Sequence, residues 1–220
     1  MMHIGHFTFN SFQTSCYIVW DESENCALID PGCADQKEFS ALTEFVVSKN
    51  LKPTCIMLTH CHFDHIYGVA ELAAQYHIPV YAGEKEVMTM EATNPTICGA
   101  YGLPLPQEIS YTPVSEGMTI SVGNMNFEVI ETPGHSKGGL CFLERGSKVL
   151  FSGDTLFAGA IGRTDHPGGD YDQLMKSIFE KLMILDGDIK VMPGHGPTSD
   201  IARERNTNPF LMPFNEPFEG

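Results

Sequence analysis

Histidine and aspartate residues recur in this chain directly after short apolar runs that end at a turn. The residues that follow four such runs are His60, His135, Asp154 and His195. Apolar and β-branched runs that end near Gly or Pro indicate buried strands, and a residue just past a strand end lies in a loop held by a rigid scaffold. The pattern therefore predicts one site built from four strand ends.

The first of these positions opens a cluster of side chains that can bind metal, because the segment continues as His60-Cys61-His62-Phe63-Asp64-His65. The complete set consists of five histidines and two aspartates: His60, His62, Asp64, His65, His135, Asp154 and His195. Imidazole binds zinc, iron and similar metals, and a carboxylate binds one ion or bridges two. If His60, His62 and His135 hold one ion while Asp64, His65 and His195 hold the other, Asp154 is left as the bridge.

The order of these ligands resembles that of the metallo-β-lactamase superfamily, and the match spans almost the whole chain. Within that superfamily the flanking segments look like the glyoxalase II (hydroxyacylglutathione hydrolase) branch. These segments are Thr59-His60, Thr132-Pro133-Gly134-His135, Gly153-Asp154-Thr155-Leu156-Phe157, Gly162-Arg163-Thr164-Asp165 and Pro193-Gly194-His195-Gly196-Pro197. The lactamases usually lack an aspartate bridge of this kind, and the diiron flavoproteins carry an acid where this chain has His62. Both are therefore less similar.

The resemblance implies an α/β fold, namely an αβ/βα four-layer sandwich of two mixed β-sheets flanked by helices. It implies that residues 1–220 form a single metallo-β-lactamase-like domain. The C-terminal helical region with which full-length glyoxalase II enzymes grip glutathione is missing, because only residues 201–220 lie beyond the segment of the last histidine. The implied substrate is a small-molecule thioester, either S-lactoylglutathione-like or another acyl thiol.

The implied activity is that of a dinuclear metallohydrolase with two divalent ions, with zinc as the first choice and iron or manganese as alternatives. Water held by two cations loses its proton near neutral pH, and one cation polarises the substrate carbonyl. A hydroxide bridging the two ions is then the nucleophile. In this hypothesis Asp64 is a metal ligand and also the catalytic residue that orients the hydroxide or accepts its proton.

Two other functions remain open at this point. The persulfide dioxygenases look similar and share a Gly-Arg-Thr-Asp segment, but they use one iron ion and molecular oxygen. The third reading is a non-catalytic binding domain that a metal stabilises. It is the weakest because structural metal sites favour closed, Cys-rich tetrahedra, whereas this set leaves room for water.

Composition sets the outer limits. A chain of 220 residues supports one domain with a large core. The formal net charge is −15 without a Lys/Arg cluster, so no nucleic-acid or membrane partner is expected. Seven irregularly spaced cysteines predict reduced thiols rather than a disulfide framework. With no signal-peptide pattern and no long apolar run, the chain is predicted to be cytoplasmic.

The hydrophobic periods predict the elements that position the site. Predicted strands are 7–9, 16–20, 26–29, 118–122, 126–131, 140–143, 148–151 and 189–192, with a further strand leading to His60. Predicted helices are 35–49, 66–76, 84–90, 171–185 and 201–205. The segment 94–106 is predicted to be a loop, and long loops in compact domains are often lids or binding loops.

The remaining histidines lack a strand-end glycine, and a structural role is favoured for them: His3, His6, His77 and His166. Arg163 is the candidate substrate-binding residue, with internal pairing to Asp165 or Asp170 as an equal alternative. Cys61 lies between ligands in the sequence, and we expect its side chain to pack away from the metals.

Overall fold

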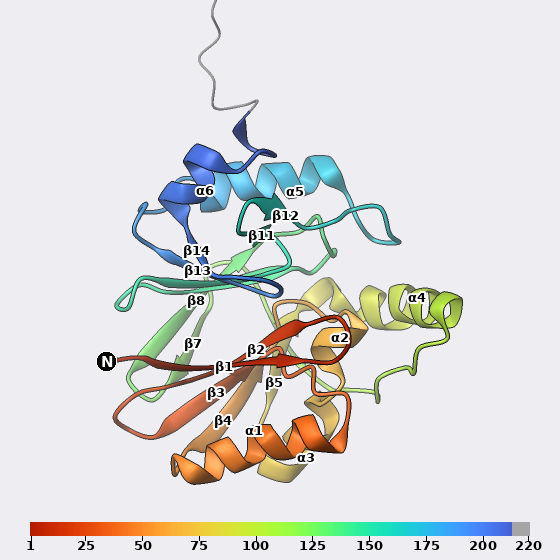
Figure 1. The fold of residues 1–220 in the computed structure, drawn as a ribbon, viewed down its shortest axis with the longest axis vertical. Coiled ribbons are helices and arrows are strands. Elements are labelled where there is room, and N and C mark those ends of the chain that lie inside the picture. Colours follow the sequence, from red (N-terminus) through yellow and green to blue (C-terminus); the bar gives the residue numbers. More distant parts are fainter. Residues whose placement is uncertain (213–220) are drawn as a thin grey trace, which may run out of the picture.

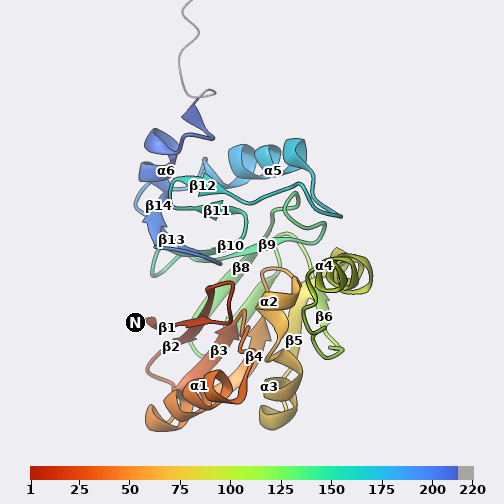
Figure 2. The same ribbon diagram turned by 45° about the vertical axis from the view of Figure 1, so that its right-hand side comes forward.

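The structure, a computed structural model, describes residues 1–212. Two six-stranded mixed sheets pack face to face, with helices on both outer sides (Figures 1 and 2). The first sheet has the order β1 (His3–Phe9), β2 (Thr14–Trp20), β3 (Asn25–Ile29), β4 (Lys52–Met57), β5 (Val80–Gly83) and β6 (Thr112–Val114). The second has the order β14 (Ser199–Asp200), β13 (Lys190–Pro193), β10 (Val149–Gly153), β9 (Leu140–Glu144), β8 (Met125–Glu131) and β7 (Thr119–Val122). The expected αβ/βα sandwich is confirmed.

Helices cover the outer face of each sheet (Figure 2). The longer α-helices are α1 (Gln36–Ser48), α3 (Val69–Tyr76), α4 (Asn94–Tyr101), α5 (Tyr171–Ser177) and α6 (Ile201–Thr207). A one-turn helix α2 (Phe63–Ile66), a 3₁₀ turn η1 (Glu84–Glu86), two π-helical turns η2 (Thr89–Thr93) and η3 (Ile178–Leu182), and a ribbon of β11 (Leu156–Phe157) and β12 (Ala160–Ile161) complete the described elements. No helix within residues 1–212 has the length and apolarity needed to cross a membrane.

Period-2 alternation in the strands separates the apolar side chains into layers. In β2, Ile18 packs under α1 and α3, whereas its neighbour Tyr17 packs between the sheets against Phe151 of β10. A third apolar layer lies between the second sheet and its helices and includes Leu174 of α5 and Ile201 of α6. The seven cysteines are all free and buried, as the sequence predicted.

The predicted helix over 66–76 is wrong at its start. The chain forms α2, breaks at Tyr67 and Gly68, and continues as α3. Gly68 lies so close to the preceding loop that a Cβ would be 2.1 Å from Sγ of Cys33, and its N–H donates to the carbonyl of Pro31 at 3.0 Å. Asp64 therefore lies within a separate turn of helix, and its carbonyl accepts from Nδ2 of Asn10 at 2.9 Å.

The prediction of a loop over 94–106 is wrong for residues 94–101, which form α4, and is confirmed for residues 103–106. The proline of α4 lies in its first turn, and Gly102 ends the helix with a left-handed φ of +65°. The helix predicted over 84–90 is confirmed as a helical segment, which consists of η1, two α-helical residues and the start of η2. The helix predicted over 171–185 becomes π-helical after Ser177. The short strands β5, β6 and β14 lack a sustained alternating pattern and were not predicted.

Candidate metal centre

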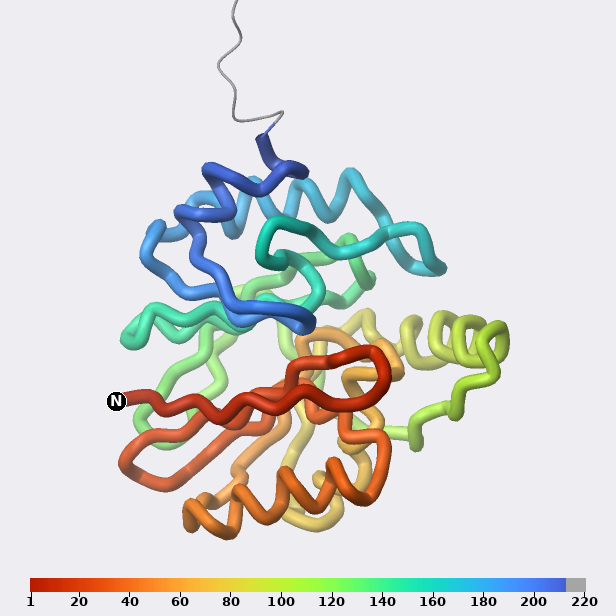
Figure 3. The backbone as a smooth tube through the Cα atoms, viewed as in Figure 1, coloured from red at the N-terminus to blue at the C-terminus, as the bar shows by residue number. Residues whose placement is uncertain are grey.

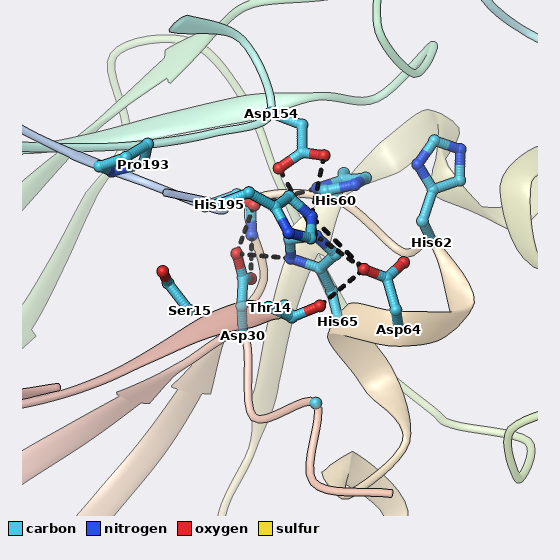
Figure 4. A network of polar contacts seen from close by, with 12 residues as sticks. Thr14, Ser15, Asp30, His60, His62, Asp64, His65, Asp154, Pro193 and His195 are labelled. Atoms are coloured by element: carbon cyan, nitrogen blue, oxygen red, sulfur yellow. Dashed lines mark hydrogen bonds and ion pairs between the residues drawn. The ribbon is translucent and has the colours of Figure 1, made fainter. Parts of the chain in front are cut away.

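Four strand ends meet at one place between the two sheets, as the sequence predicted. The loops after β4, β8, β10 and β13 carry His60, His135, Asp154 and His195, respectively. The imidazoles of His60, His65 and His195 lie between the carboxylates of Asp64 and Asp154 (Figure 4). The structure thus brings together all seven residues that the sequence singled out.

The first group within this cluster consists of three buried histidines, His60, His62 and His135, whose candidate ligand atoms all lie within 4.8 Å of one another. Nδ1 of His62 is 2.9 Å from Nε2 of His135, and their rings are nearly perpendicular. Two imidazole nitrogens at this separation face a common point. Three such rings offer three nitrogen donors to one ion.

The second group consists of Asp64, His65 and His195, again within 4.8 Å of one another. Nε2 of His65 lies 3.3 Å from Nε2 of His195. Oδ2 of Asp64 lies 3.5 Å from the former nitrogen and 3.4 Å from the latter. One carboxylate and two imidazoles form a donor set suited to a borderline divalent metal.

Asp154 lies between the two groups. Its Oδ1 is 3.5 Å from Nε2 of His65, and its Oδ2 is 3.5 Å from Nε2 of His135 and 3.4 Å from Nε2 of His195. Oδ2 thus approaches both groups, whereas Oδ1 approaches the second group alone. A carboxylate within reach of both groups can bridge two ions.

The outward ring nitrogens of the histidines are held by hydrogen bonds. The Nδ1–H of His135 donates to the carbonyl of Arg163 at 2.8 Å, and that of His195 donates to the carbonyl of Phe12 at 3.0 Å. The Nδ1–H of His65 donates to Oδ2 of Asp30 at 3.1 Å. These partners orient each ring so that Nε2 faces the cluster and is the nitrogen available to a cation.

His60 is held through Thr59 and Asp30. The hydroxyl of Thr59 donates to Oδ2 of Asp30 at 2.6 Å, so its oxygen accepts from Nδ1 of His60 at 3.1 Å. The candidate ligand atoms of Asp30, His60 and His65 also all lie within 4.8 Å of one another. We assign Asp30 to support because both its oxygens already accept hydrogen bonds, from Thr59 and from His65.

The β1–β2 hairpin braces the second group. The hydroxyl of Thr14, which is fully buried, donates to Oδ2 of Asp64 at 2.7 Å. The backbone N–H of Ser15 donates to the carbonyl of Gly194 at 2.7 Å, and Tyr17 donates to the carbonyl of Pro193 at 2.7 Å. The hairpin and the loop after β13 therefore run side by side (Figure 3).

Glu86 braces the first group from the other side. This fully buried carboxylate accepts from the backbone N–H of Cys61 at 2.7 Å, from the hydroxyl of Ser136 at 2.6 Å and from the N–H of Gly138 at 3.0 Å. Burial raises the pKa of Glu86, although these donors oppose the shift. One side chain thus ties the loop of His60 and His62 to the loop of His135.

Electrostatics divide the cluster into neutral and charged parts. Burial lowers the pKa of His60 and His62 well below the usual value and lowers that of His135. Burial would raise the pKa of Asp64, but His65, His195 and Thr14 lower it to about 2. Asp154 likewise has its pKa lowered by its histidine neighbours despite burial. Ionised carboxylates and the neutral imidazoles of the first group are the forms that bind cations. In the second group, by contrast, the neighbouring carboxylates outweigh burial and raise the pKa of His65 to about 8 and that of His195 to about 11.

Arg163 does not point into the cluster. Its guanidinium forms a bidentate pair with Asp165 at 2.8 and 3.0 Å, and both side chains are mostly exposed. Of the two alternatives left open by the sequence, the structure supports internal pairing with Asp165, and only the backbone carbonyl of Arg163 serves the site. Cys61 packs into the core beneath the first sheet, as expected.

His166 lies beside the cluster, which the sequence did not predict. A structural role was favoured for it, yet its ring lies against His62 and His135, with centroid separations of 4.8 and 5.0 Å. Thr14 and Glu86 were also missed, because their contacts join residues about fifty positions apart. The one sequence signal for His166 was its place directly after the Gly162-Arg163-Thr164-Asp165 segment.

The donor set fits bound metal. Nε2 of His60 and Oδ1 of Asp154 are buried and have no hydrogen-bond partner among residues 1–212. Buried polar atoms are nearly always paired, so such atoms on converging ligand-type side chains indicate a place for cations. The fold and this cluster define the class of protein: an αβ/βα sandwich with a histidine- and aspartate-rich metal centre between its sheets.

The chain belongs to the metallo-beta-lactamase superfamily, whose family model matches residues 10–200. It is similar to a hydroxyacylglutathione hydrolase, GloC, of Haemophilus influenzae, with 35% identity over 96% of this chain and 98% of that protein. Among solved structures, the BLEG-1 B3 metallo-beta-lactamase matches with a TM-score of 0.87 and 33% identity, covering 95% of this chain and 99% of that one. The di-iron-bound form of TTHA1623 matches with a TM-score of 0.83 and 36% identity, covering 94% and 100%.

Proposed function

We propose that this chain is a dinuclear metal-dependent hydrolase that cleaves a thioester, in the manner of a hydroxyacylglutathione hydrolase. The observation that carries the proposal is the position of Asp154, which faces histidines of both ligand groups. An aspartate in this position supports two adjacent ions rather than one. Similarity to GloC over nearly the whole of both chains supports the choice of substrate class.

In this proposal His60, His62 and His135 would hold one ion, Asp64, His65 and His195 would hold the other, and Asp154 would contribute to both. Two such divalent ions would supply an activated water near neutral pH and polarise a carbonyl oxygen. Zinc, iron and manganese all accept this donor set. The di-iron form of TTHA1623 supports iron among these metals.

The chain's own residues then have distinct tasks. Thr14 and Asn10 fix the side chain and the backbone of Asp64, respectively, which keeps its carboxylate aimed at the cluster. Asp64 is proposed to accept the proton of the attacking water, because its carboxylate is ionised and lies at the second group. The hydrogen bonds to Asp30 and to Phe12 hold His65 and His195 in the orientation in which Nε2 faces the cluster.

The surroundings of the site bear on the thiol part of the substrate. Arg163 is engaged by Asp165, so a substrate carboxylate would have to displace that carboxylate in order to bind there. The formal net charge of −15 adds no general attraction for an anionic thiol such as glutathione. A panel of neutral and anionic thioesters is therefore needed, and the proposal commits to the thioester rather than to glutathione.

The test combines metal analysis with a substrate panel. The purified chain is loaded separately with zinc, iron and manganese, and ions per chain are counted. Hydrolysis is then followed for S-lactoylglutathione, short acyl thioesters and a chromogenic β-lactam, because BLEG-1 is described as a lactamase. We expect two ions per chain and thioester cleavage that exceeds β-lactam cleavage.

Three results would reject this function. One iron per chain with oxygen uptake on a persulfide substrate would favour a dioxygenase. Faster cleavage of the β-lactam than of any thioester would favour a lactamase. Metal that is needed only for folding, without turnover of any substrate, would favour a binding domain.

A further inference from the structure

His62 differs from the other four histidines of the cluster in its outward contacts. The rings of His60, His65, His135 and His195 each have Nδ1 hydrogen-bonded to an oxygen of the surrounding protein. His62 instead turns Nδ1 toward Nε2 of His135, and its Nε2 is buried without a hydrogen-bond partner among the described residues. A ligand histidine normally donates its other N–H to a neighbour, so this nitrogen needs an acceptor.

The ring next to that nitrogen is His166. Its centroid lies 4.8 Å from that of His62, with the two planes perpendicular. Nε2 of His166 is the second ring nitrogen in this corner that is buried and unpaired within residues 1–212. Two adjacent rings therefore each present one unused nitrogen, in a setting where unpaired polar atoms are costly.

The protons of the two rings are complementary. A nitrogen that binds a metal carries no proton, so a metal on Nδ1 of His62 places that ring's proton on Nε2. His166 has the opposite tautomer: its Nδ1 lies 3.3 Å from the carbonyl of Pro167, which can only accept. The lone pair of His166 is thus on Nε2, where an N–H of His62 would find its acceptor.

The loop holds His166 at this position. The hydroxyl of Thr93 donates to the carbonyl of Pro167 at 2.8 Å, and the N–H of Gly169 donates to the carbonyl of His166 at 2.9 Å. The N–H of Asp170 donates to the carbonyl of Gly134, next to His135, at 2.8 Å. The loop is therefore tied both to η2 and to the first ligand group.

We propose that His166 is a positioning residue for the first metal ion: its Nε2 accepts a hydrogen bond from Nε2–H of His62 when His62 binds the ion through Nδ1. Because the two rings are perpendicular, forming this bond requires one of them to rotate. The inference rests on the ligand groups of the proposed function and is independent of the substrate. It gives the loop over 162–170 a role in metal binding that a phenylalanine of similar shape could not fill.

The test compares His166→Phe, which keeps an aromatic ring, with His166→Gln, which keeps a hydrogen-bond acceptor. His3→Phe, on the exposed start of β1, is the matched control. Zinc dissociation constants are measured for both steps by competition with a chelator, and His195→Ala identifies the step that belongs to the second group. We expect His166→Phe to weaken the zinc affinity of the first group by about 10- to 100-fold. His166→Gln should recover most of the loss, and His3→Phe should change nothing.

A second measurement works on the unmodified chain. In the zinc-loaded protein, ¹⁵N-resolved NMR of the imidazole rings should show a proton on Nε2 of His62 that exchanges slowly with water, and this signal should be lost in His166→Phe. An unchanged first-step constant in His166→Phe, equal losses in the Phe and Gln variants, or a proton on Nδ1 of His62 would each overturn the inference. Failure to hydrolyse thioesters would reject the proposed function but would leave these readings unaffected.

Discussion

Replacing Thr14 by valine removes a single hydroxyl from the second ligand group and keeps the shape of the side chain. That hydroxyl donates to Oδ2 of Asp64 at 2.7 Å from a fully buried position, so water cannot take its place. A hydrogen bond to a charged group contributes about 1.5–3 kcal/mol. At about 1.4 kcal/mol per factor of ten, losing this hydrogen bond should weaken the binding of the ion at Asp64 by roughly 10- to 150-fold. The change should be confined to the second group.

The assay is stepwise zinc binding in competition with a chelator, with calorimetry as an independent reading. Thr14→Ser keeps the hydroxyl and should retain nearly all of the affinity, which separates the hydrogen bond from any effect of side-chain volume. The binding step assigned to the first group should not change in either variant. Equal affinity of Thr14→Val and the unmodified chain for the second ion would refute the idea that the hairpin orients Asp64.

Three further substitutions test other parts of the site. Asp64→Asn should retain partial metal binding while kcat falls by at least about 100-fold in steady-state hydrolysis; full activity would remove its proposed role as base. In Glu86→Gln the side-chain amide N–H would face a backbone N–H, so two donors would meet without an acceptor. The free energy of unfolding measured in urea should fall by about 1–3 kcal/mol. In Gly194→Ala the new Cβ would lie 2.1 Å from Oδ1 of Asp154, so the bound-metal count should fall, whereas Gly99→Ala in open space should leave it unchanged.

The sequence predicted which histidines and aspartates cluster because each lies in a local pattern. In the segment 127–131, for example, apolar residues are interspersed with polar ones, the run ends at a turn, and His135 follows. Both the strand and the histidine after its end are therefore recognisable in the sequence. The same local logic located α1, whose buried Phe39 and Leu42 recur at helical spacing after the capping residue Asp35.

The supporting contacts left no such signature. Thr14 and Asp64 are fifty residues apart, and Glu86 reaches donors on loops that flank it in sequence on both sides, so only the folded chain brings them together. The helix α4 was missed for a different reason. A proline and a glycine in a short segment usually indicate a loop, but this proline falls in the first helical turn, and Gly99 has open space around it.

Two aspartates, Asp30 and Asp154, each follow a strand and lie beside the same histidines, yet their contacts assign them opposite roles. Asp30 accepts hydrogen bonds from the Nδ1–H of His65 and the hydroxyl of Thr59, so these donors already compensate its negative charge. Asp154 faces Nε2 of His65 and His135, the ring nitrogens that are not used in the outer hydrogen bonds. Its buried charge needs a positive partner there, either a bound cation or the proton of His65, whose pKa the neighbouring carboxylates raise to about 8 despite burial. The ring orientations fixed by the protein therefore determine which aspartate supports the site and which faces the metal.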